Sequence, residues 1–352
     1  MPLVSLRDIS KSYNNIPALH RISLDVFAGD ILAFMGPNGA GKTTAIKIMT
    51  GLLRPDSGTV FYKGVPFSPG NSEQKRLLGV VPQNSNLDRD LTAEDNLRIH
   101  GMLFGMKGKA LAARMDEVLE AVDLNEYKNQ IAGRLSGGLQ RRLTIARALL
   151  HNPRILFLDE PSNGLDPTSR RAIHGLVRRL NKETGVSVFL TTHAIDEAEA
   201  LSNRVAFINR GTLVAEGKSQ AMKAAIGRFA LDIMDSSGAF SLAETRYFSL
   251  RADALKAAQQ ILAGSSVAAG GDLPAAAGTG LPDARKIETG ARGIETDARE
   301  IATDALAGRY SNVHIREVTL EDAYARATGN RMASQAETVE GEAKQPGRNG
   351  HA

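Results

Sequence analysis

Hydrophobic and polar positions near the start of the chain follow the spacing of strands and then of a helix. In residues 22–26 (ISLDV) apolar and polar side chains alternate, which predicts a half-buried strand, and residues 31–35 (ILAFM) form a continuous apolar run, which predicts a fully buried one. From residue 46 to residue 53 the apolar residues recur at helical spacing. The glycine-rich segment 36–41 therefore lies between a strand and the start of a helix.

Similar patterns continue through the middle of the chain. Residues 92–127 contain mostly helix formers and predict a helical subdomain. The next segments alternate between the two kinds of element: helix 139–150, strand 155–158, helix 167–180, strand 186–192, helix 195–201 and strand 204–208. This alternation predicts a mostly parallel sheet with helices on both faces, whereas segments 1–35 and 58–64 favour antiparallel pairing.

The pattern changes after about residue 225. Residues 264–283 are rich in glycine, alanine and proline and predict a flexible link. Residues 284–305 repeat every seven positions and place alanine and isoleucine on a heptad seam. This seam fits either a single amphipathic helix or loose segment, or a helix that pairs with another chain. Residues 331–352 lack apolar periodicity and are predicted to be disordered.

Composition and charge narrow the classes of function. The chain has 352 residues, 42% of them hydrophobic, enough for one large core and a smaller second domain. It has no cysteine, which excludes disulfides, thiolate nucleophiles and cysteine-ligated metals. The formal net charge of +4 gives little support for nucleic-acid binding, so no nucleic-acid partner is expected. No signal peptide and no spanning helix are expected, so any transport work needs a membrane partner.

The glycine-rich segment carries the first candidate chemistry. Eight consecutive residues fit the P-loop pattern G-x-x-x-x-G-K-[ST], and Thr44 follows them: Gly36, Pro37, Asn38, Gly39, Ala40, Gly41, Lys42 and Thr43. The glycines allow successive backbone N–H groups to point at phosphate oxygens, and the helix N-terminus adds partial positive charge. Lys42 is expected to reach the β- and γ-phosphates of ATP, and the Thr43 hydroxyl is expected to ligate Mg²⁺.

An acidic pair follows the buried strand predicted at residues 155–158. Asp159 is expected at the carboxyl end of that strand, where parallel sheets bind ligands, and it can hold Mg²⁺ directly or through water. Glu160 faces another direction and is placed to accept a proton from a water that attacks the γ-phosphate. Such a pair alone would be interpreted as the solvated end of a strand. Because this chain also contains a P-loop, we interpret the pair as part of a catalytic site.

Residues 135–140 (LSGGLQ) resemble the signature motif of the ABC ATPase family. In that family the motif caps the γ-phosphate bound by the other subunit, so that two ATP molecules lie between two P-loops and two signatures. The resemblance assigns this role to Ser136, Gly137 and Gly138, at the start of a helix. Leu139 departs from the commonest form, which has glutamine there, and such variants are familiar in some exporter subfamilies.

The same resemblance implies roles for four more residues. Tyr13 resembles the aromatic residue that stacks on adenine, and Gln83 resembles the glutamine that touches Mg²⁺ and the attacking water. His193 resembles the histidine that contacts the γ-phosphate. Asp166 ends a segment, SNGLD, that resembles the loop crossing the dimer interface. Without the surrounding motifs, a lone tyrosine or histidine would be interpreted as a packed ring.

The resemblance extends over residues 3–220 and implies a fold. We expect an α/β P-loop NTPase cassette in residues 1–225, with a mostly parallel sheet, an antiparallel β subdomain and a helical subdomain. A small C-terminal α+β accessory domain is expected in residues 226–330. Residues 86–88 (NLD) through 91–97 (LTAEDNL), and later 319–324 (TLEDAY), look like the drug-resistance or ABC-2 type exporter ATPases, which pair with separate permeases.

The expected function is therefore that of an ATP-hydrolysing subunit. It would work as a head-to-tail homodimer on an integral-membrane permease, peripheral on the cytoplasmic face of the cell membrane, and power export of an unidentified cargo. A soluble ABC ATPase acting on DNA or ribosomes and a nucleotide-sensing regulatory module are the alternatives. Only residues 44–134 separate the P-loop from the signature, too few for the long insertions of DNA-repair members, and Glu160 and His193 argue against a sensor.

Overall fold

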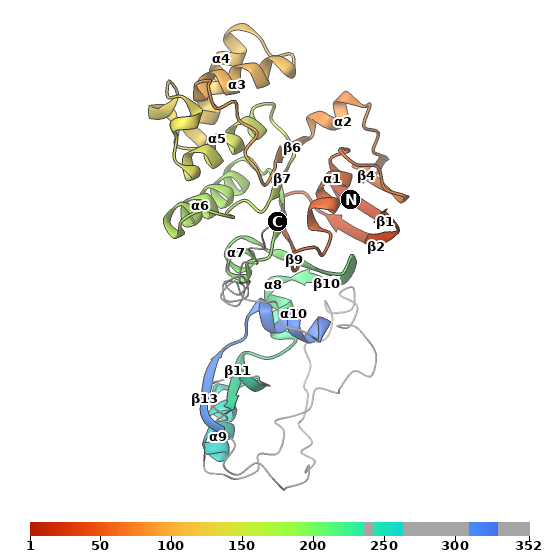
Figure 1. Ribbon diagram of the computed structural model, residues 1–352, viewed down its shortest axis with the longest axis vertical. Coiled ribbons are helices and arrows are strands. Elements are labelled where there is room, and N and C mark those ends of the chain that lie inside the picture. The colour runs from red at the N-terminus through yellow and green to blue at the C-terminus, as the bar shows by residue number, and fades with distance from the viewer. Residues whose placement is uncertain (236–241, 263–309, 330–352) are drawn as a thin grey trace, which may run out of the picture.

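The computed structural model describes residues 1–235, 242–262 and 310–329. The predicted link 264–283, the heptad repeat 284–305 and the tail 331–352 lie outside these ranges. Figure 1 shows the two large sheets and the helices around them in the upper part of the molecule, with a small third sheet below.

An antiparallel sheet is formed by the first strands of the chain. Its order is β2-β1-β4-β5, with β1 (Val4–Tyr13), β2 (Ile16–Val26), β4 (Ser57–Tyr62) and β5 (Val65–Pro66). Antiparallel pairing is confirmed for these strands. It was wrong for residues 31–35, because β3 (Ile31–Met35) pairs in parallel with β8 and β9. All five residues of β3 are buried, as expected for a strand covered on both faces.

A six-stranded sheet forms the centre of the molecule, in the order β10-β9-β3-β8-β7-β6. The strands besides β3 are β6 (Leu78–Val81), β7 (Ile155–Asp159), β8 (Ser187–Thr192), β9 (Arg204–Asn209) and β10 (Thr212–Lys218). All neighbours pair in parallel except β10, which pairs antiparallel with β9. This arrangement confirms the mostly parallel sheet, and the buried runs of β7 and β8 explain its apolar sequence pattern.

Helices cover both faces of this sheet. One face, with Phe34 and Phe157, packs against α1 (Lys42–Met49) and the antiparallel sheet. The other face, with Met35 and Leu158, packs against α6 (Pro167–Thr184), α7 (Ile195–Leu201) and the helical subdomain. That subdomain contains α3 (Ala93–Leu103), α4 (Gly108–Ala121), α5 (Gly137–Leu149) and two short 3-10 helices, Asn125–Tyr127 and Ala132–Arg134. The remaining helices before residue 225 are α2 (Ser72–Arg76) and α8 (Ser219–Ala224).

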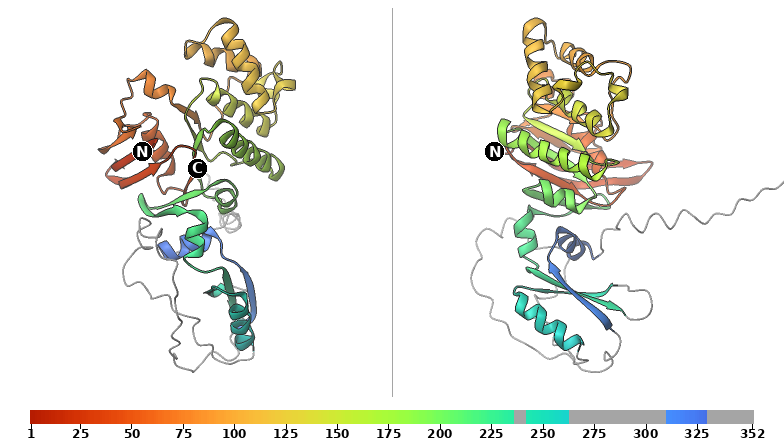
Figure 2. Two further views of the ribbon diagram at one scale, coloured as in Figure 1. Left: turned by 180° about the vertical axis from the view of Figure 1, so that it is seen from behind. Right: turned by 90° about the vertical axis from the view of Figure 1, so that its left-hand side faces the viewer.

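The third sheet contains β11 (Phe229–Asp235), β12 (Leu242–Phe248) and β13 (Tyr310–Glu317), all antiparallel, in the order β12-β11-β13. Helix α9 (Arg251–Leu262) covers one face (Figure 2), where Leu231 and Ile233 pack with Ala254. These elements form the small α+β unit that the family resemblance implied.

Helix α10 (Leu320–Thr328) leaves the third sheet and returns to the central one. Leu320 and Tyr324 belong to the same hydrophobic core as β9, and the ring of Tyr324 meets the ring of Phe207 edge-on, with centroids 5.5 Å apart. The boundary at residue 225 remains a prediction. In the structure, α10 from beyond that boundary completes the core of the elements before it.

Candidate functional site

The P-loop connects the end of β3 to the start of α1, and its backbone requires glycine at several points. Gly39 and Gly41 have φ angles of 78° and 106°, in the left-handed region that glycine adopts without a steric penalty. At Gly36 a Cβ atom would lie only 2.2 Å from the carbonyl oxygen of Ile208. The glycine pattern therefore follows from the geometry of this loop.

Lys42 extends across the loop that precedes it. Its Nζ donates to the carbonyl oxygens of Gly36, at 2.9 Å, and Pro37, at 3.2 Å, and lies 3.4 Å from Oε1 of Glu160. Only 5% of the side chain is exposed. Burial lowers the pKa of Lys42, although Glu160 and Asp159 oppose this change by favouring the charged ammonium.

Glu160 occupies a sharp turn at the end of β7. Its φ of 44° is in the left-handed region, an unfavourable conformation for this residue type, and its N–H donates to the carbonyl oxygen and the hydroxyl of Thr191. Its Oε1 lies 3.2 Å from Nδ1 of His193, and its Oε2 accepts from the Asn163 amide at 3.1 Å. The hydrogen bond with His193 is the main cause that lowers the pKa of Glu160, with a smaller contribution from Lys42. The carboxylate is therefore ionised at neutral pH.

Asp159 lies beneath the turn, and its side chain points toward α1. Its Oδ1 accepts from the Thr191 hydroxyl at 2.5 Å and from the Thr43 hydroxyl at 3.4 Å. Thr43 and Asp159 thus present neighbouring oxygen donors, the kind of ligand that Mg²⁺ prefers. Within the described ranges, no group of three or more His, Cys, Asp or Glu side chains could hold a metal alone.

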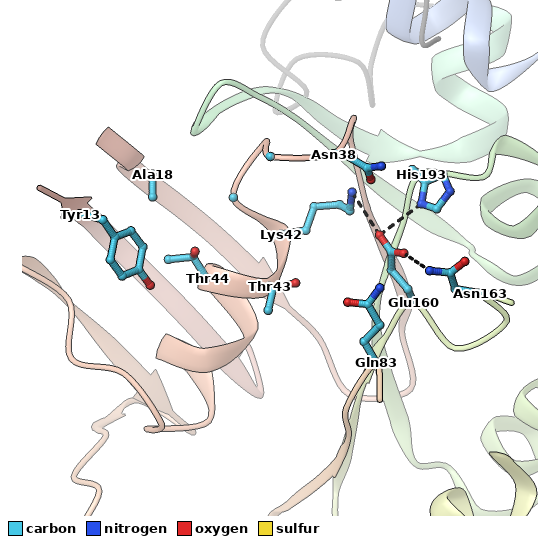
Figure 3. A pocket seen from close by; sticks show the side chains of 12 residues that line it. Tyr13, Ala18, Asn38, Lys42, Thr43, Thr44, Gln83, Glu160, Asn163 and His193 are labelled. Carbon is cyan, nitrogen blue, oxygen red and sulfur yellow. Dashed lines mark hydrogen bonds and ion pairs between the residues drawn. The ribbon is translucent and has the colours of Figure 1, made fainter. Parts of the chain in front are cut away.

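Lys42, Glu160 and His193 line one open pocket of about 570 Å³, a size typical of small-ligand sites. Its lining comprises Tyr13, Ala18, Asn38, Gly39, Gly41, Lys42, Thr43, Thr44, Gln83, Glu160, Asn163 and His193. Figure 3 shows Tyr13 at one end and the group around Glu160 at the other. Tyr13 is 46% exposed, so part of it is available for contact with a ligand.

Comparison with known proteins identifies the family. A family model described as "ABC transporter" matches residues 19–163. Nod factor export ATP-binding protein I of Burkholderia lata is 39% identical over 219 residues, which cover 62% of this chain and 72% of the relative. The protein of that name from Mesorhizobium japonicum is 38% identical and is matched over 64% of its length. The chain belongs to the ABC transporter family, as an ATP-binding subunit.

Solved structures of ABC cassettes agree with this assignment. A dimeric ATP-binding cassette in a post-hydrolysis state, bound to ADP and Pi, is 31% identical, with a TM-score of 0.56 over 61% of this chain and 98% of that one. The cbiO1 protein of Clostridium perfringens, part of the ABC transporter complex cbiONQ, is 25% identical, with a TM-score of 0.58 over 62% of this chain and 88% of that one. This ABC subunit is therefore a P-loop ATPase that binds ATP.

The cassette leaves several predicted residues outside its pocket. Ser136, Gly137 and Gly138 begin α5, where the Ser136 hydroxyl accepts the N–H of Leu139 at 3.4 Å. Asp166 accepts the N–H groups of Thr168 and Ser169, at 2.9 and 3.0 Å, and so caps α6. These caps, together with Asp159, Gly36, Pro37 and Ala40, do not line the pocket.

Two lining residues of the ABC pocket were not predicted as site residues. Asn163 lies in the loop SNGLD, but its bond to the Glu160 side chain depends on the turn at the end of β7. Ala18 comes from β2, and its carbonyl oxygen would lie 2.5 Å from a Cβ atom at Gly41. A small apolar residue in a strand gives no chemical signal, so only the fold shows its place.

Among the residues that the structure describes, no helix of this ABC subunit is long and apolar enough to cross a membrane.

Proposed function

We propose that this ABC ATPase binds MgATP in the pocket, pairs head-to-tail with a second copy and so drives export through a separate membrane permease. One observation carries the proposal. Lys42 and His193 both contact the same carboxylate oxygen of Glu160, at 3.4 and 3.2 Å, inside a pocket lined by a P-loop (Figure 3). A phosphate-binding ammonium, a candidate base and a histidine are thus within reach of one terminal phosphate.

Nucleotide binding follows from the chemistry of the lining. Adenine stacks on Tyr13, and the N–H groups of the P-loop surround the phosphates. Lys42 exchanges its contact with Glu160 for phosphate oxygens, which are stronger partners for a charged donor. The oxygens of Thr43, Gln83 and Asp159 would hold Mg²⁺, directly or through water, and the ion would supply charge neutralisation for the phosphates.

Hydrolysis then uses the far end of the pocket. The oxygen of a water forms a bond to the γ-phosphorus, and the bond from this phosphorus to the β–γ bridging oxygen breaks, with its electron pair remaining on ADP. The proton of the water passes to Glu160, which the low pKa keeps ionised beforehand. His193 orients the carboxylate and donates toward the γ-phosphate.

Pairing of two copies completes the site. The α5 start with Ser136, Gly137 and Gly138 and the α6 start with Asp166 lie outside the pocket of their own chain. In the head-to-tail arrangement, the α5 start of one copy faces the γ-phosphate in the other, where its N–H groups and helix dipole favour negative charge. The similar cassette with ADP and Pi is dimeric, which supports pairing.

The permease is expected to bind the helical subdomain. Ile99, Met102 and Leu103 on α3 expose 44, 52 and 79% of their surface, and their helical spacing places them on one side of this helix. The relatives named for Nod factor export support export as the direction. Joined to such a permease, the subunit would be peripheral on the cytoplasmic face of the membrane.

Substitution of Glu160 by glutamine tests the proposal. The variant should retain MgATP binding and pair more stably, while turnover falls by about 10²- to 10⁴-fold because the base is lost. Phosphate release measures turnover, and sedimentation with and without MgATP measures pairing. Glu73→Gln, at an exposed position of α2, is the matched control and should behave as wild type. Near-normal phosphate release by Glu160→Gln, or solitary subunits at saturating MgATP, would contradict the proposal.

A further inference from the structure

A buried arginine in α5 connects three parts of the ATP site. Arg141 begins the second turn of α5, and only 7% of it is exposed. Its Nε donates to the carbonyl oxygen of Pro161 at 2.8 Å, and Nη2 donates to that of Asp159 at 2.9 Å. Its Nη1 donates to the carbonyl oxygens of Pro82 and Gln83. One guanidinium therefore contacts both residues flanking Glu160 and the main chain of Gln83.

The chemistry of this contact is specific to arginine. Three of the acceptors, Pro82, Gln83 and Pro161, lie beyond the ends of β6 and β7, and Asp159 is the last residue of β7. A buried charge is tolerated only when its donors are satisfied, and the planar fork of a guanidinium can serve several acceptors in fixed directions. Burial lowers the pKa of Arg141 to about 10, and Glu197 and Asp159 oppose this change, so the side chain remains charged at neutral pH.

A fourth segment is connected through Glu197. This residue of α7 is only 2% exposed, its charge favours the charged form of Arg141, and its Oε1 lies 3.3 Å from Nε2 of His174 on α6. Helix α7 begins at Ile195, directly after the loop that carries His193. The start of α7 is thus within electrostatic reach of Arg141 through Glu197.

We propose that Arg141 is a positioning residue that couples the two half-sites of one subunit. Because α5 is a rigid helix, Arg141 fixes the position of Ser136–Gly138 relative to Glu160 and Gln83. The first group serves the ATP of the partner and the second serves the ATP of its own chain. This inference rests on the proposed head-to-tail pairing and adds the connection by which the state of one site reaches the other.

The test compares Arg141→Gln with Arg114→Gln. Arg114 also donates to main-chain carbonyls, those of Leu149 and Leu150 at the opposite end of α5, at 2.9 and 3.1 Å, but it touches no segment of the pocket. Arg141→Gln should bind ATP as a monomer with unchanged affinity, because the P-loop is intact. Its turnover at saturating MgATP should fall by about 10- to 100-fold, as expected when catalytic groups are slightly misplaced. In a Glu160→Gln background, its MgATP-dependent pairing should also weaken by about tenfold or more.

Thermal unfolding separates positioning from general destabilisation. Both variants should unfold at lower temperature, but only the Arg141 variant should lose turnover and pairing. Arg141→Lys keeps the charge with fewer directed donors, and it should recover folding but not full turnover. If Arg141→Gln does not fold, Arg141→Lys replaces it, with a turnover loss of about fivefold or more expected at unchanged ATP affinity.

The outcomes distinguish this inference from the proposed function. If wild type hydrolyses ATP and Glu160→Gln pairs, but the Arg141 variants match Arg114→Gln in turnover and pairing, the Arg141 inference fails alone. If turnover falls while pairing is unchanged, Arg141 positions only the site of its own chain, and the coupling is refuted. If wild type does not hydrolyse ATP, or Glu160→Gln does not pair, the proposed function fails and the coupling with it.

Discussion

Gly36 lies where the P-loop comes closest to the last residues of β9. A Cβ atom there would meet the carbonyl oxygen of Ile208 at 2.2 Å, and a main-chain atom cannot rotate away. Gly36→Ala should therefore lower the free energy of unfolding by about 1–3 kcal/mol and weaken ATP binding, because the loop must shift. Urea unfolding and nucleotide titration measure the two effects.

Gly175→Ala is the matched control for this prediction. Gly175 lies inside α6, and nothing is within 4 Å of a Cβ atom placed there. Alanine favours a helix over glycine, so this variant should be more stable by about 0.5–1 kcal/mol. Equal effects of the two substitutions would show that the close approach at Gly36 does not constrain the loop.

His100 makes stability depend on pH. Its ring lies among Phe104 and His151, with centroid separations of 5.1 and 6.2 Å. Burial is the main cause that lowers the pKa of His100 to about 4, and the charges of Arg147 and His151 add to it. Since an unfolded histidine takes up its proton near its ordinary value of about 6.5, the unfolded chain binds more protons between these two values, and stability rises with pH across that window.

His100→Gln should reduce this dependence. We expect wild type to lose at most about 2 kcal/mol from this residue between about pH 7 and pH 5, and less to the extent that water reaches the ring. Urea unfolding at several pH values measures the slope, which should be shallower in the variant. His20→Gln, on an exposed position of β2, should leave the slope unchanged. A wild-type slope after His100→Gln would exclude His100 as its source.

At the scale of residues, the sequence predicted those pocket residues whose reactive side chains follow buried strands. Glu160 and His193 directly follow the buried strands β7 and β8, and Lys42 follows β3 through the P-loop, so parallel pairing brings them to one edge of the sheet. It did not identify Arg141 as a site residue, because its partners are main-chain carbonyls, which any sequence supplies. The sequence also did not identify His100, because its low pKa arises from packing between α3 and the end of α5, which only the fold shows.

Helix α10 begins with a cap that also connects the third sheet to the cassette. Asp322 accepts from the Thr319 N–H at 2.8 Å, and Thr319 and Asp322 together form a capping box. Arg316 on β13 donates to Asp322 and to Asp232 on β11, at 2.8 and 2.7 Å. Burial would raise the pKa of Asp322, but hydrogen bonds from Arg316 and Thr319 outweigh it, and the pKa lies below its usual value.

Asp322→Asn should therefore destabilise the docking of α10. The variant loses charge-assisted hydrogen bonds to Arg316, and we expect a loss of about 1.5–3 kcal/mol. Because the pKa is lowered, the contribution of Asp322 in wild type should be present above the usual carboxyl range and disappear as the pH falls through the lower folded value. Thermal unfolding at neutral and acidic pH measures both.

The control for this prediction is Glu244→Gln on β12. Glu244 pairs with Arg246 at 2.8 Å, but its side chain is 43% exposed. A surface pair of this kind contributes about 0–1 kcal/mol, so little change is expected. If the two variants were equally stable, the network around Asp322 would have no special role in holding α10.

At the scale of elements, the sequence pattern predicted fully buried strands better than strands with one covered face. The strands β3, β7 and β8 are buried along their full length, and the apolar runs of the first two predict this burial. The antiparallel pairing expected for residues 31–35 was wrong because such a run marks burial without indicating the direction of its neighbours. The third sheet has one face covered by α9, and its strands gave no pattern clear enough to predict them without the family resemblance.

At the scale of the molecule, helix α10, which follows the third sheet, contacts α7, the helix that follows the His193 loop. Glu199 on α7 accepts the N–H of Leu320 at 2.9 Å and pairs with Lys223 at 3.3 Å. Helix α7 begins directly after the His193 loop, so α10 is attached one helix away from the γ-phosphate end of the pocket. The cassette and the C-terminal unit therefore share one continuous core around α7, α8 and α10.

The return of α10 also sets an order for synthesis. Ribosomes release a chain from its N-terminus, and domains commonly fold as soon as they emerge. Here Leu320, Ala323 and Tyr324 belong to the core that includes Phe207 and Met222, although more than a hundred residues follow β9 before they appear. A nascent chain that ends at residue 262 would leave that part of the core open to water. Newly made subunits thus become fully compact only at a late stage of translation.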